Sequence, residues 1–518
     1  MKSSIDSIVV TAKQMSQIEE QIFSAGMPVA ALMEKAARLC AERIIDRFPV
    51  SQFATVGILV GPGHNGGDAL VIARELYLAG YQIKIYRPLP KLKELTAGHA
   101  NYAASLEIDF YENVDALKKC QLMIDGLFGF GLSRELHENI RQAIRSINAW
   151  SQPIVSIDIP SGINTDTGAV LGEAIRATHT LCLGLWKRAF FQDQALEYIG
   201  TSERVDFGLL DHQIVSTLSL PPPLRQMTNT MALASLPLPR SATTYKYHQG
   251  HLLLICGSRT YSGAALLTAL GARASGVGML SIAVPKTLKN LVASHLPDAL
   301  VIECPENAAG AIDSLPLSES ELNKFDVIAC GPGLTQDSKT IVEKIFESKC
   351  PLVLDADALN ILAEKNATEV LVQRPAPTIL TPHLGEFRRL FPDRKDISDR
   401  LSAVKTAAEC TKSIVLLKGA KTAIANPEGL LWLISESTPA LARGGSGDVL
   451  TGLTAGLVAQ STKNESNLFD SVACAAWWHA QAAIRAAKER TDLGVDALTL
   501  TGYLTTTLSD LLEPNGKA

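Results

Sequence analysis

Short apolar, β-rich runs alternate with helix-length segments along most of this chain. The runs are 56–60, 83–86, 122–125 and 154–158 in the first part, and 252–256, 279–284, 327–330, 352–355, 378–380 and 414–417 in the second. Strands of this length separated by helices predict parallel sheets that are covered by helices on both faces. Ligands of such open sheets bind outside the carboxyl ends of the strands. We therefore expect an α/β fold whose functional residues lie at strand ends.

A proline-rich stretch divides the chain into two parts. Pro221, Pro222 and Pro223 are followed by Pro237 and Pro239. Consecutive prolines are stiff and cannot continue a helix or a central strand. The 518 residues also favour more than one domain. We expect a domain over 1–220, a linker over 221–240 and a second domain over 241–518.

Composition excludes several classes of protein. Hydrophobic residues make up 47% of the chain, charged residues 19%, and the net charge is −5, so nothing indicates nucleic acid or an anionic membrane as a partner. The nine cysteines form no Cys-x-x-Cys pair, which argues against a zinc site or a disulfide framework. The first 13 residues lack a signal-peptide core, and charge interrupts the apolar stretches. We expect a soluble cytoplasmic protein.

The run Gly444-Gly445-Ser446-Gly447-Asp448-Val449-Leu450 is the strongest functional signal. Its glycines free backbone N–H groups to face an anion, and the helix predicted to follow adds positive potential at its start. Asp448 could then accept the proton of a hydroxyl that attacks a phosphoryl group. The alternative is a common glycine-rich turn with an aspartate that complements the helix dipole.

Polar residues follow three predicted strands of the first part. Gly61 to Asp68 form a glycine-rich turn before a helix predicted over 68–79. The turn is neither a dinucleotide fingerprint nor a Walker loop, but it could hold a phosphate, or Asp68 could simply cap the helix. Asn65, Asp125 and either Ser161 or Asp158 could converge on one cation. Their hard oxygen ligands suit an alkali or alkaline-earth ion, although each alone could be a cap or turn residue.

Several blocks at predicted strand ends accompany Asp448 in the second part. They are Gly257–Ala265, Gly331–Leu334, Asp355–Asn360, Thr381–Phe387 and Lys418–Thr422, and Lys246–His251 precedes the first strand. Each block alone fits a turn, a helix start or a strand end. Their joint occurrence beside an anion-binding run predicts a site for phosphoryl transfer.

The first part resembles the YjeF N-terminal family, the NAD(P)H-hydrate epimerases. The family pattern Gly-x-Gly-Asn-Asn-Gly-Gly-Asp, Asp-x-Leu-Phe-Gly-x-Gly and Asp-Ile-Pro-Ser-Gly matches roughly residues 10–215, except that His64 replaces an asparagine. The resemblance implies a Rossmann-like three-layer sandwich, with K⁺ held by Asn65, Asp125 and Ser161. The implied contacts to the hydrated dinucleotide are His64, Asn65, Gly66, Gly67, Asp68, Gly129, Phe130, Gly131, Leu132, Ser133, Arg134, Glu135 and Asp158. We further expect Asp158 to be a catalytic proton shuttle.

The second part resembles the YjeF C-terminal family, the ADP- or ATP-dependent NAD(P)H-hydrate dehydratases, over roughly residues 230–510. Thr-Pro-His-x-Gly-Glu-Phe, Leu-Lys-Gly and Gly-Gly-x-Gly-Asp-Val-Leu carry the likeness, which implies a ribokinase-like three-layer domain. Ala264, Gly333 and His383 would face the hydrated dinucleotide, with Asp448 as the catalytic base. The implied nucleotide-binding residues are Lys418, Gly419, Ala420, Lys421, Thr422 and Gly447, and Mg²⁺ would assist.

Together the two resemblances imply a fused repair enzyme for NADHX and NADPHX, the hydrated forms of NADH and NADPH. One part would equilibrate the R and S hydrates, and the other would dehydrate the S form using ADP or ATP. The fusion favours ADP, and we also expect a homo-oligomer. A small-molecule kinase with a regulatory front domain, and a dinucleotide-sensing or scaffold module, are the two alternatives.

Overall fold

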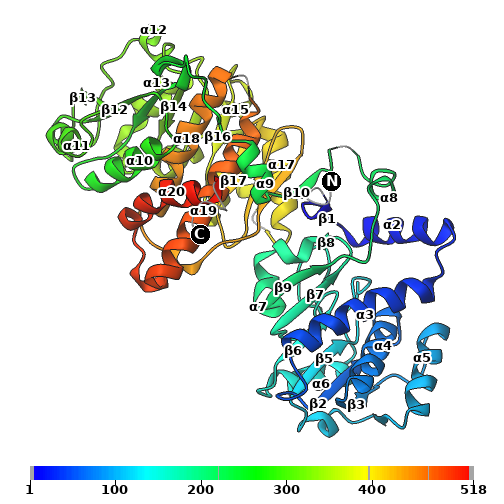
Figure 1. The fold of residues 1–518 in the computed structure, drawn as a ribbon. Helices are drawn as coiled ribbons and strands as arrows, with labels where there is room; N and C mark the ends of the chain where they lie inside the picture. Colours follow the sequence, from blue (N-terminus) through cyan, green and yellow to red (C-terminus); the bar gives the residue numbers. More distant parts are fainter. Residues whose placement is uncertain (1–4, 220, 395–396, 465, 513–518) are drawn as a thin grey trace. The chain divides into compact units, whose positions relative to one another are not determined.

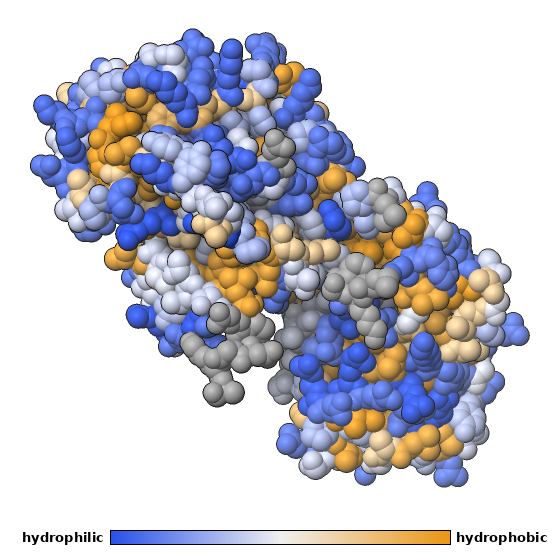
Figure 2. All heavy atoms as spheres, turned by 45° about the horizontal axis from the view of Figure 1, so that its top comes forward, coloured by the Kyte–Doolittle hydropathy of each residue, from blue (hydrophilic) through white to orange (hydrophobic). Residues whose placement is uncertain are grey.

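The structure is a computed structural model that describes residues 5–219, 221–394, 397–464 and 466–512 (Figure 1). The chain forms two compact units, Met1–Pro223 and Leu224–Ala518. Both units are α/β, as the alternation of apolar runs predicts. No helix within the described ranges is long and apolar enough to cross a membrane. Polar side chains cover much of the face shown in Figure 2, and its apolar residues lie in scattered groups.

The first unit contains a seven-stranded sheet in which every pair is parallel. Across the sheet the strands are β4 (Asp109–Tyr111), β3 (Gln82–Tyr86), β2 (Thr55–Val60), β5 (Leu122–Gly126), β6 (Ile154–Ile157), β7 (His179–Leu183) and β9 (Thr201–Val205). A separate parallel pair joins β1 (Val9–Val10) to β8 (Trp186–Lys187). The helices are α2 (Ala12–Ser24), α3 (Val29–Arg47), α4 (His64–Leu78), α5 (Glu94–Ser105), α6 (Glu138–Asn148), α7 (Leu196–Ile199) and α8 (Asp211–Val215).

Side-chain alternation along β2 explains the three layers of this unit. Ile58 and Val60 belong to the core formed with α3, α4 and α5, whereas Leu59 belongs to the core formed with α6. Successive side chains of a strand point to opposite faces, so a strand covered by helices on both sides is apolar throughout. This is why the central strands could be recognised as continuous apolar runs.

The second unit contains a ten-stranded sheet. Its strands, in order, are β10 (Leu224–Gln226), β19 (Leu431–Ile434), β18 (Thr422–Ala425), β17 (Ile414–Leu417), β16 (Thr378–Leu380), β15 (Leu352–Leu354), β14 (Val327–Cys330), β11 (His251–Ile255), β12 (Met279–Pro285) and β13 (Leu300–Cys304). β18 runs antiparallel to both of its neighbours, so the expectation of a wholly parallel sheet is wrong here. A short hairpin turn joins β17 to β18, which permits antiparallel pairing without a crossover helix.

Helices cover both faces of this second sheet. They are α9 (Asn229–Ala234), α10 (Ser262–Ala274), α11 (Lys289–His295), α12 (Glu319–Leu322), α13 (Lys339–Phe346), α14 (Ala356–Ala363), α15 (Ala367–Val372), α16 (Leu384–Leu390), α17 (Arg400–Thr411), α18 (Ser446–Asn464), α19 (Leu468–Arg490) and α20 (Ala497–Leu512). Leu252 and Leu254 pack in a core with α10, α18, α19 and α20. Leu253 and Ile255, which alternate with them, are also fully buried.

The predicted linker extends too far toward the C-terminus. Leu224–Gln226 pairs in parallel with β19, and α9 packs against α19, so residues from Leu224 onward are part of the second unit. The proline run itself ends at Pro223, where the first unit ends. An edge strand accepts neighbouring prolines because one of its sides needs no hydrogen-bond partner.

Candidate active sites

Asp125 occupies a buried position near the end of β5 in the first unit. Its carboxylate accepts the Ser161 hydroxyl at 2.6 Å, the Ser161 N–H at 2.8 Å and the Ser156 hydroxyl at 2.8 Å. Burial raises the pKa of Asp125, and these hydrogen bonds oppose the rise. No cation of the described part of the chain pairs with it. The structure thus brings the oxygens of Asp125 and Ser161 together, as ligands of one cation would be.

Asn65 and Asp158 converge on the backbone of Gly129. A methyl group at Gly129 would lie 3.3 Å from the Asn65 Oδ1 and 3.2 Å from the Asp158 Oδ2. The Asn65 side-chain nitrogen is buried and has no hydrogen-bond partner in the described structure. A buried polar group without a partner is costly, so this N–H donor is open to a substrate group or a water molecule.

Glycines before α4 and in its first turn are required by close packing. An added methyl group at Gly66 would lie 2.0 Å from the Gly61 carbonyl oxygen, and one at Gly61 would lie 1.6 Å from the Leu127 carbonyl oxygen. The helix begins at His64, four residues before the predicted start, so Asp68 lies inside it and does not cap it. Burial, with Asp158 and Glu19 nearby, raises the pKa of Asp68 well above its ordinary value.

Lys187 is the residue of this site that sequence reasoning missed. Its ammonium donates to the Asp158 Oδ1 at 2.5 Å, and both side chains are almost completely buried. The Phe130 N–H donates to the Asp158 Oδ2 at 3.0 Å, and Thr165 donates to the Phe130 carbonyl at 2.8 Å. The first residues of the predicted 129–135 segment therefore reach Asp158, whereas Ser133, Arg134 and Glu135 are exposed.

Asp448 lies in the first turn of α18 in the second unit, and this helix packs closely against α10. An added methyl group at Gly452 would fall 1.8 Å from the Thr268 carbonyl oxygen, so glycine permits the approach. Asp355, after β15, accepts Lys418 at 2.7 Å and the Thr451 hydroxyl of α18 at 2.7 Å. Asp355 thereby ties Lys418, at the end of β17, to the helix that carries Asp448.

The charges around Asp448 suit a base that works near neutral pH. Burial and the Asp355 carboxylate raise the pKa of Asp448 to about 7, against the opposing effect of Lys418. Burial lowers the pKa of Lys418, but Asp355 and Glu386 outweigh it, so the net shift is upward and Lys418 stays an ammonium. An added methyl group at Gly447 would lie 3.4 Å from that ammonium, which places a fixed cation beside the glycine run.

Two of the residues predicted to face the dinucleotide, Ala264 and Gly333, lie close together. Gly333 has a φ of +68°, and an added methyl group there would lie 2.8 Å from the Ala264 methyl and 2.9 Å from the Tyr261 Cβ. His383 caps α16, where its Nδ1 accepts the Gly385 N–H at 2.9 Å, and its side chain is 55% exposed. Ala264 and Gly333 are therefore neighbours, and the second ring nitrogen of His383, Nε2, lies 3.4 Å from the Glu386 Oε1.

The predicted nucleotide-binding segment forms the turn between β17 and β18. Gly419 and Ala420 are exposed, and the Lys421 ammonium donates to the Ser435 carbonyl. The buried Arg400 donates to the Leu417 carbonyl at 2.9 Å, and a side chain at Gly419 would collide with its guanidinium. Lys418 therefore points to Asp355, whereas Lys421 is tied to the neighbouring strand.

His479 is a second residue that sequence reasoning missed. It is buried on α19, and its Nε2 lies 2.9 Å from the Ser446 carbonyl at the start of α18. Burial lowers the pKa of His479 to about 4, so the ring is neutral and its N–H can donate to that carbonyl. His479 thus holds the first turn of the helix that presents Asp448.

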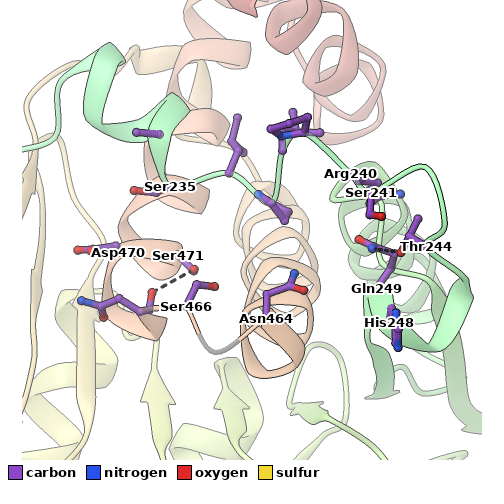
Figure 3. Close-up of a pocket in the computed structure, with 16 residues that line it drawn as sticks. Ser235, Arg240, Ser241, Thr244, His248, Gln249, Asn464, Ser466, Asp470 and Ser471 are labelled. Carbon is purple, nitrogen blue, oxygen red and sulfur yellow. Dashed lines mark hydrogen bonds between the residues drawn. The ribbon is translucent and has the colours of Figure 1, made fainter.

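A cavity of about 540 Å³ lies elsewhere in the second unit (Figure 3). The segment from Ala234 to Gln249 forms one wall, and residues around Asn464 and Asp470 form another. Gln249 donates to the Thr244 hydroxyl at 2.6 Å within it. His248 and Gln249, from the block Lys246–His251, line this cavity, but none of the residues predicted for catalysis or for binding substrate, nucleotide or metal does.

Comparison with known proteins identifies the family. Residues 252–506 match the family model described as NAD(P)H-hydrate dehydratase, and residues 29–189 match the model of the YjeF-related protein N-terminus. The bifunctional NAD(P)H-hydrate repair enzyme Nnr of Synechocystis sp. is 52% identical over 507 residues, covering 98% of this chain and 96% of the relative. Its namesake in Thermosynechococcus vestitus is 50% identical, with 98% of each chain covered.

A solved ADP/ATP-dependent NAD(P)H-hydrate dehydratase from Bacillus subtilis, co-crystallised with ATP/Mg²⁺, is 31% identical. It covers 55% of this chain and 98% of its own, with a TM-score of 0.48. The two relatives named first match almost the whole of this chain, and the two family models fall on its two units. The chain therefore belongs to the family of bifunctional NAD(P)H-hydrate repair enzymes.

Proposed function

We propose that the first unit interconverts the R and S forms of hydrated NADH and NADPH, and that the second unit dehydrates the S form. ADP or ATP would supply the phosphoryl group for dehydration. The observation that carries the proposal is the placement of Asp448 at the start of α18, beside the Lys418–Asp355 pair, with its pKa raised to about 7. Family membership supports both activities.

The second unit would convert a poor leaving group into a good one. Asp448 accepts the proton of the substrate hydroxyl as its oxygen attacks the terminal phosphorus of the nucleotide. Lys418 and the N–H groups of the glycine run stabilise the charge on the transferring group. The C–O bond then breaks with loss of phosphate, the neighbouring ring carbon loses a proton, and the double bond of NADH or NADPH is restored.

Mg²⁺ would enter this site with the nucleotide, because Mg²⁺ usually binds through substrate phosphates and one or two carboxylates. Asp448 and Asp355 supply carboxylate oxygens at this edge of the sheet, which fits such an ion. When bound, it would offset the phosphate charge. The proposed nucleotide contacts remain Lys418, Gly419, Ala420, Lys421, Thr422 and Gly447.

The first unit would invert the hydroxyl-bearing carbon. Loss of the hydroxyl leaves a ring cation, and the hydroxyl then returns on the other face of the ring. Asp158 moves the proton that the hydroxyl oxygen gains as it leaves and loses as it returns. Asn65, Asp125 and Ser161 would hold K⁺. The Asn65 Oδ1 and the buried Asp125 carboxylate, which has no cation partner in the described residues, supply oxygens that fit such an ion. When bound, K⁺ supplies positive charge beside the dinucleotide.

The assay uses a mixture of R and S hydrates and follows the absorbance of the regenerated reduced dinucleotide. It is run with ADP and with ATP, and with and without K⁺. We expect nucleotide-dependent recovery of the whole mixture, and ADP is the favoured donor. A stable phosphorylated product without recovery would instead support a small-molecule kinase.

We also propose that the protein is cytoplasmic and forms a homo-oligomer. Size-exclusion chromatography with light scattering tests the oligomeric state.

A further inference from the structure

We propose that Lys187 is a positioning residue that fixes the Asp158 carboxylate and leaves its Oδ2 as the oxygen that handles the substrate proton. This inference rests on the proposed epimerase function of the first unit. It concerns a lysine on the two-residue strand β8, 29 positions beyond Asp158 in the sequence.

The ammonium of Lys187 has no proton left for a substrate. An ammonium carries three N–H donors. Those of Lys187 meet the Asp158 Oδ1, the Leu183 carbonyl and, at 3.8 Å, the Cys182 sulfur. The side chain is only 1% exposed. Lys187 therefore acts through Asp158 and does not touch the dinucleotide.

The two oxygens of Asp158 have different surroundings. Oδ1 accepts from Lys187 and, at 3.4 Å, from the Leu183 N–H, which accounts for both of its acceptor positions. Within the described residues, Oδ2 accepts one hydrogen bond, from the Phe130 N–H at 3.0 Å, so one acceptor position remains. Because Gly129 has no side chain, the space next to Oδ2 stays open.

The backbone of Asp158 is held in an uncommon conformation. Its φ of +69° lies in the left-handed region, which aspartate tolerates better than most residues but still at some cost. A carboxylate on such a backbone needs outside contacts to keep one orientation. Lys187 supplies the strongest of them, because the pair is charged and shielded from water.

Among the described residues, Lys187 is the cation that pairs with Asp158. Glu19 on α2 and Asp68 on α4 both have raised pKa values, chiefly through burial, and the value for Glu19 is about 7. Burial likewise raises the pKa values of the thiols of Cys40 and Cys182. The electrostatic surroundings of the pair are thus mostly neutral or acidic, and a lysine lost here would leave Asp158 without its charge partner.

The test compares Lys187→Met, Asp158→Asn and the double variant in the full-length protein, with R-to-S conversion measured from pure R hydrate. Lys187→Met should lower kcat by about 100-fold or more with little change in KM, because a positioned base contributes at least that much. In the Asp158→Asn background, Lys187→Met should cause little further loss, since its effect passes through the carboxylate. Lys13→Met, an exposed lysine of the same unit, is the control and should change neither constant.

Folding and function are separated within the same experiment. The double variant removes both buried charges, so it should fold even if Lys187→Met alone is unstable. Dehydration of pure S hydrate by each variant reports an intact second unit. A wild-type kcat for well-folded Lys187→Met, or a large further loss in the double variant, would overturn the inference. Wild-type protein that fails to accelerate R-to-S conversion would instead overturn the proposed epimerase function.

Discussion

Lys418 and Asp355 form a 2.7 Å ion pair that joins the end of β17 to the end of β15. The second oxygen of Asp355 accepts the Thr451 hydroxyl of α18, one turn beyond Gly447. The pair therefore fixes the position of the ammonium relative to the helix that presents Asp448. It also sets the charge that Asp448 experiences.

The dehydration rate should rise as the pH increases through about 7, because Asp448 accepts a proton only when deprotonated. Asp355→Asn removes a negative charge that raises the pKa of Asp448, so the acid limb should move to lower pH while kcat falls. Initial rates on pure S hydrate across the neutral range measure this. Asp313→Asn, an exposed position of the same unit, should leave the profile in place. If the acid limb of the pH–rate profile did not move in Asp355→Asn, Asp355 would not control the pKa of the base Asp448.

Asp448→Asn should abolish nucleotide-dependent dehydration and leave R-to-S conversion intact. A general base contributes about 10²- to 10⁴-fold, and the amide cannot accept the proton. Absorbance of the reduced dinucleotide measures dehydration, and chromatography of the two hydrates measures epimerisation. Full dehydratase activity in this variant would refute the role of Asp448.

His479→Phe should weaken the start of α18. The substitution keeps a buried ring but removes the donor to the Ser446 carbonyl, which costs about 1–3 kcal/mol for a buried unsatisfied group. We expect lower thermal stability and slower dehydration, with epimerisation unchanged. His295→Phe alters an exposed histidine of the same unit and is the control. Equal melting curves and rates for the two variants would contradict the role given to His479.

Gly129→Ala should impair epimerisation. Its methyl group would stand 3.2 Å from the Asp158 Oδ2 and 3.3 Å from the Asn65 Oδ1, in the space proposed for the substrate. Gly98→Ala places a methyl group in open space on α5, so it should keep the wild-type rate. Steady-state kinetics on R hydrate compare the two. Equal activity would mean that the substrate does not approach Asp158 past Gly129.

Much of the fold could be predicted because its central strands are buried on both faces. Such strands are continuous apolar runs that end at glycine or aspartate, as in Thr55–Val60 and Leu352–Leu354. The edge strand Leu224–Gln226 and the antiparallel strand Thr422–Ala425 carry no comparable signal. They are three and four residues long, and their pairing is set by neighbours that are distant in sequence or by the turn between them.

The sites could be predicted where one local segment carries the chemistry. The glycine run with Asp448 and the strand-end residues Asn65, Asp125 and Asp158 are of this kind. Lys187 and His479 could not be found in this way. Lys187 meets Asp158 across 29 positions and His479 meets Ser446 across 33, and no local spacing encodes either contact. Asp355 begins the segment 355–360 that follows a predicted strand, but only the structure shows that it binds both Lys418 and Thr451.

The most direct test supplies pure R hydrate with ADP or ATP, Mg²⁺ and K⁺ to three proteins: wild type, Asp158→Ala and Asp448→Asn. Spontaneous epimerisation is subtracted, and recovery of the reduced dinucleotide is followed. We expect that wild type repairs the R hydrate, that Asp158→Ala repairs only added S hydrate, and that Asp448→Asn equilibrates the two hydrates without repairing either. Repair of the R hydrate by Asp158→Ala at the wild-type rate would contradict it.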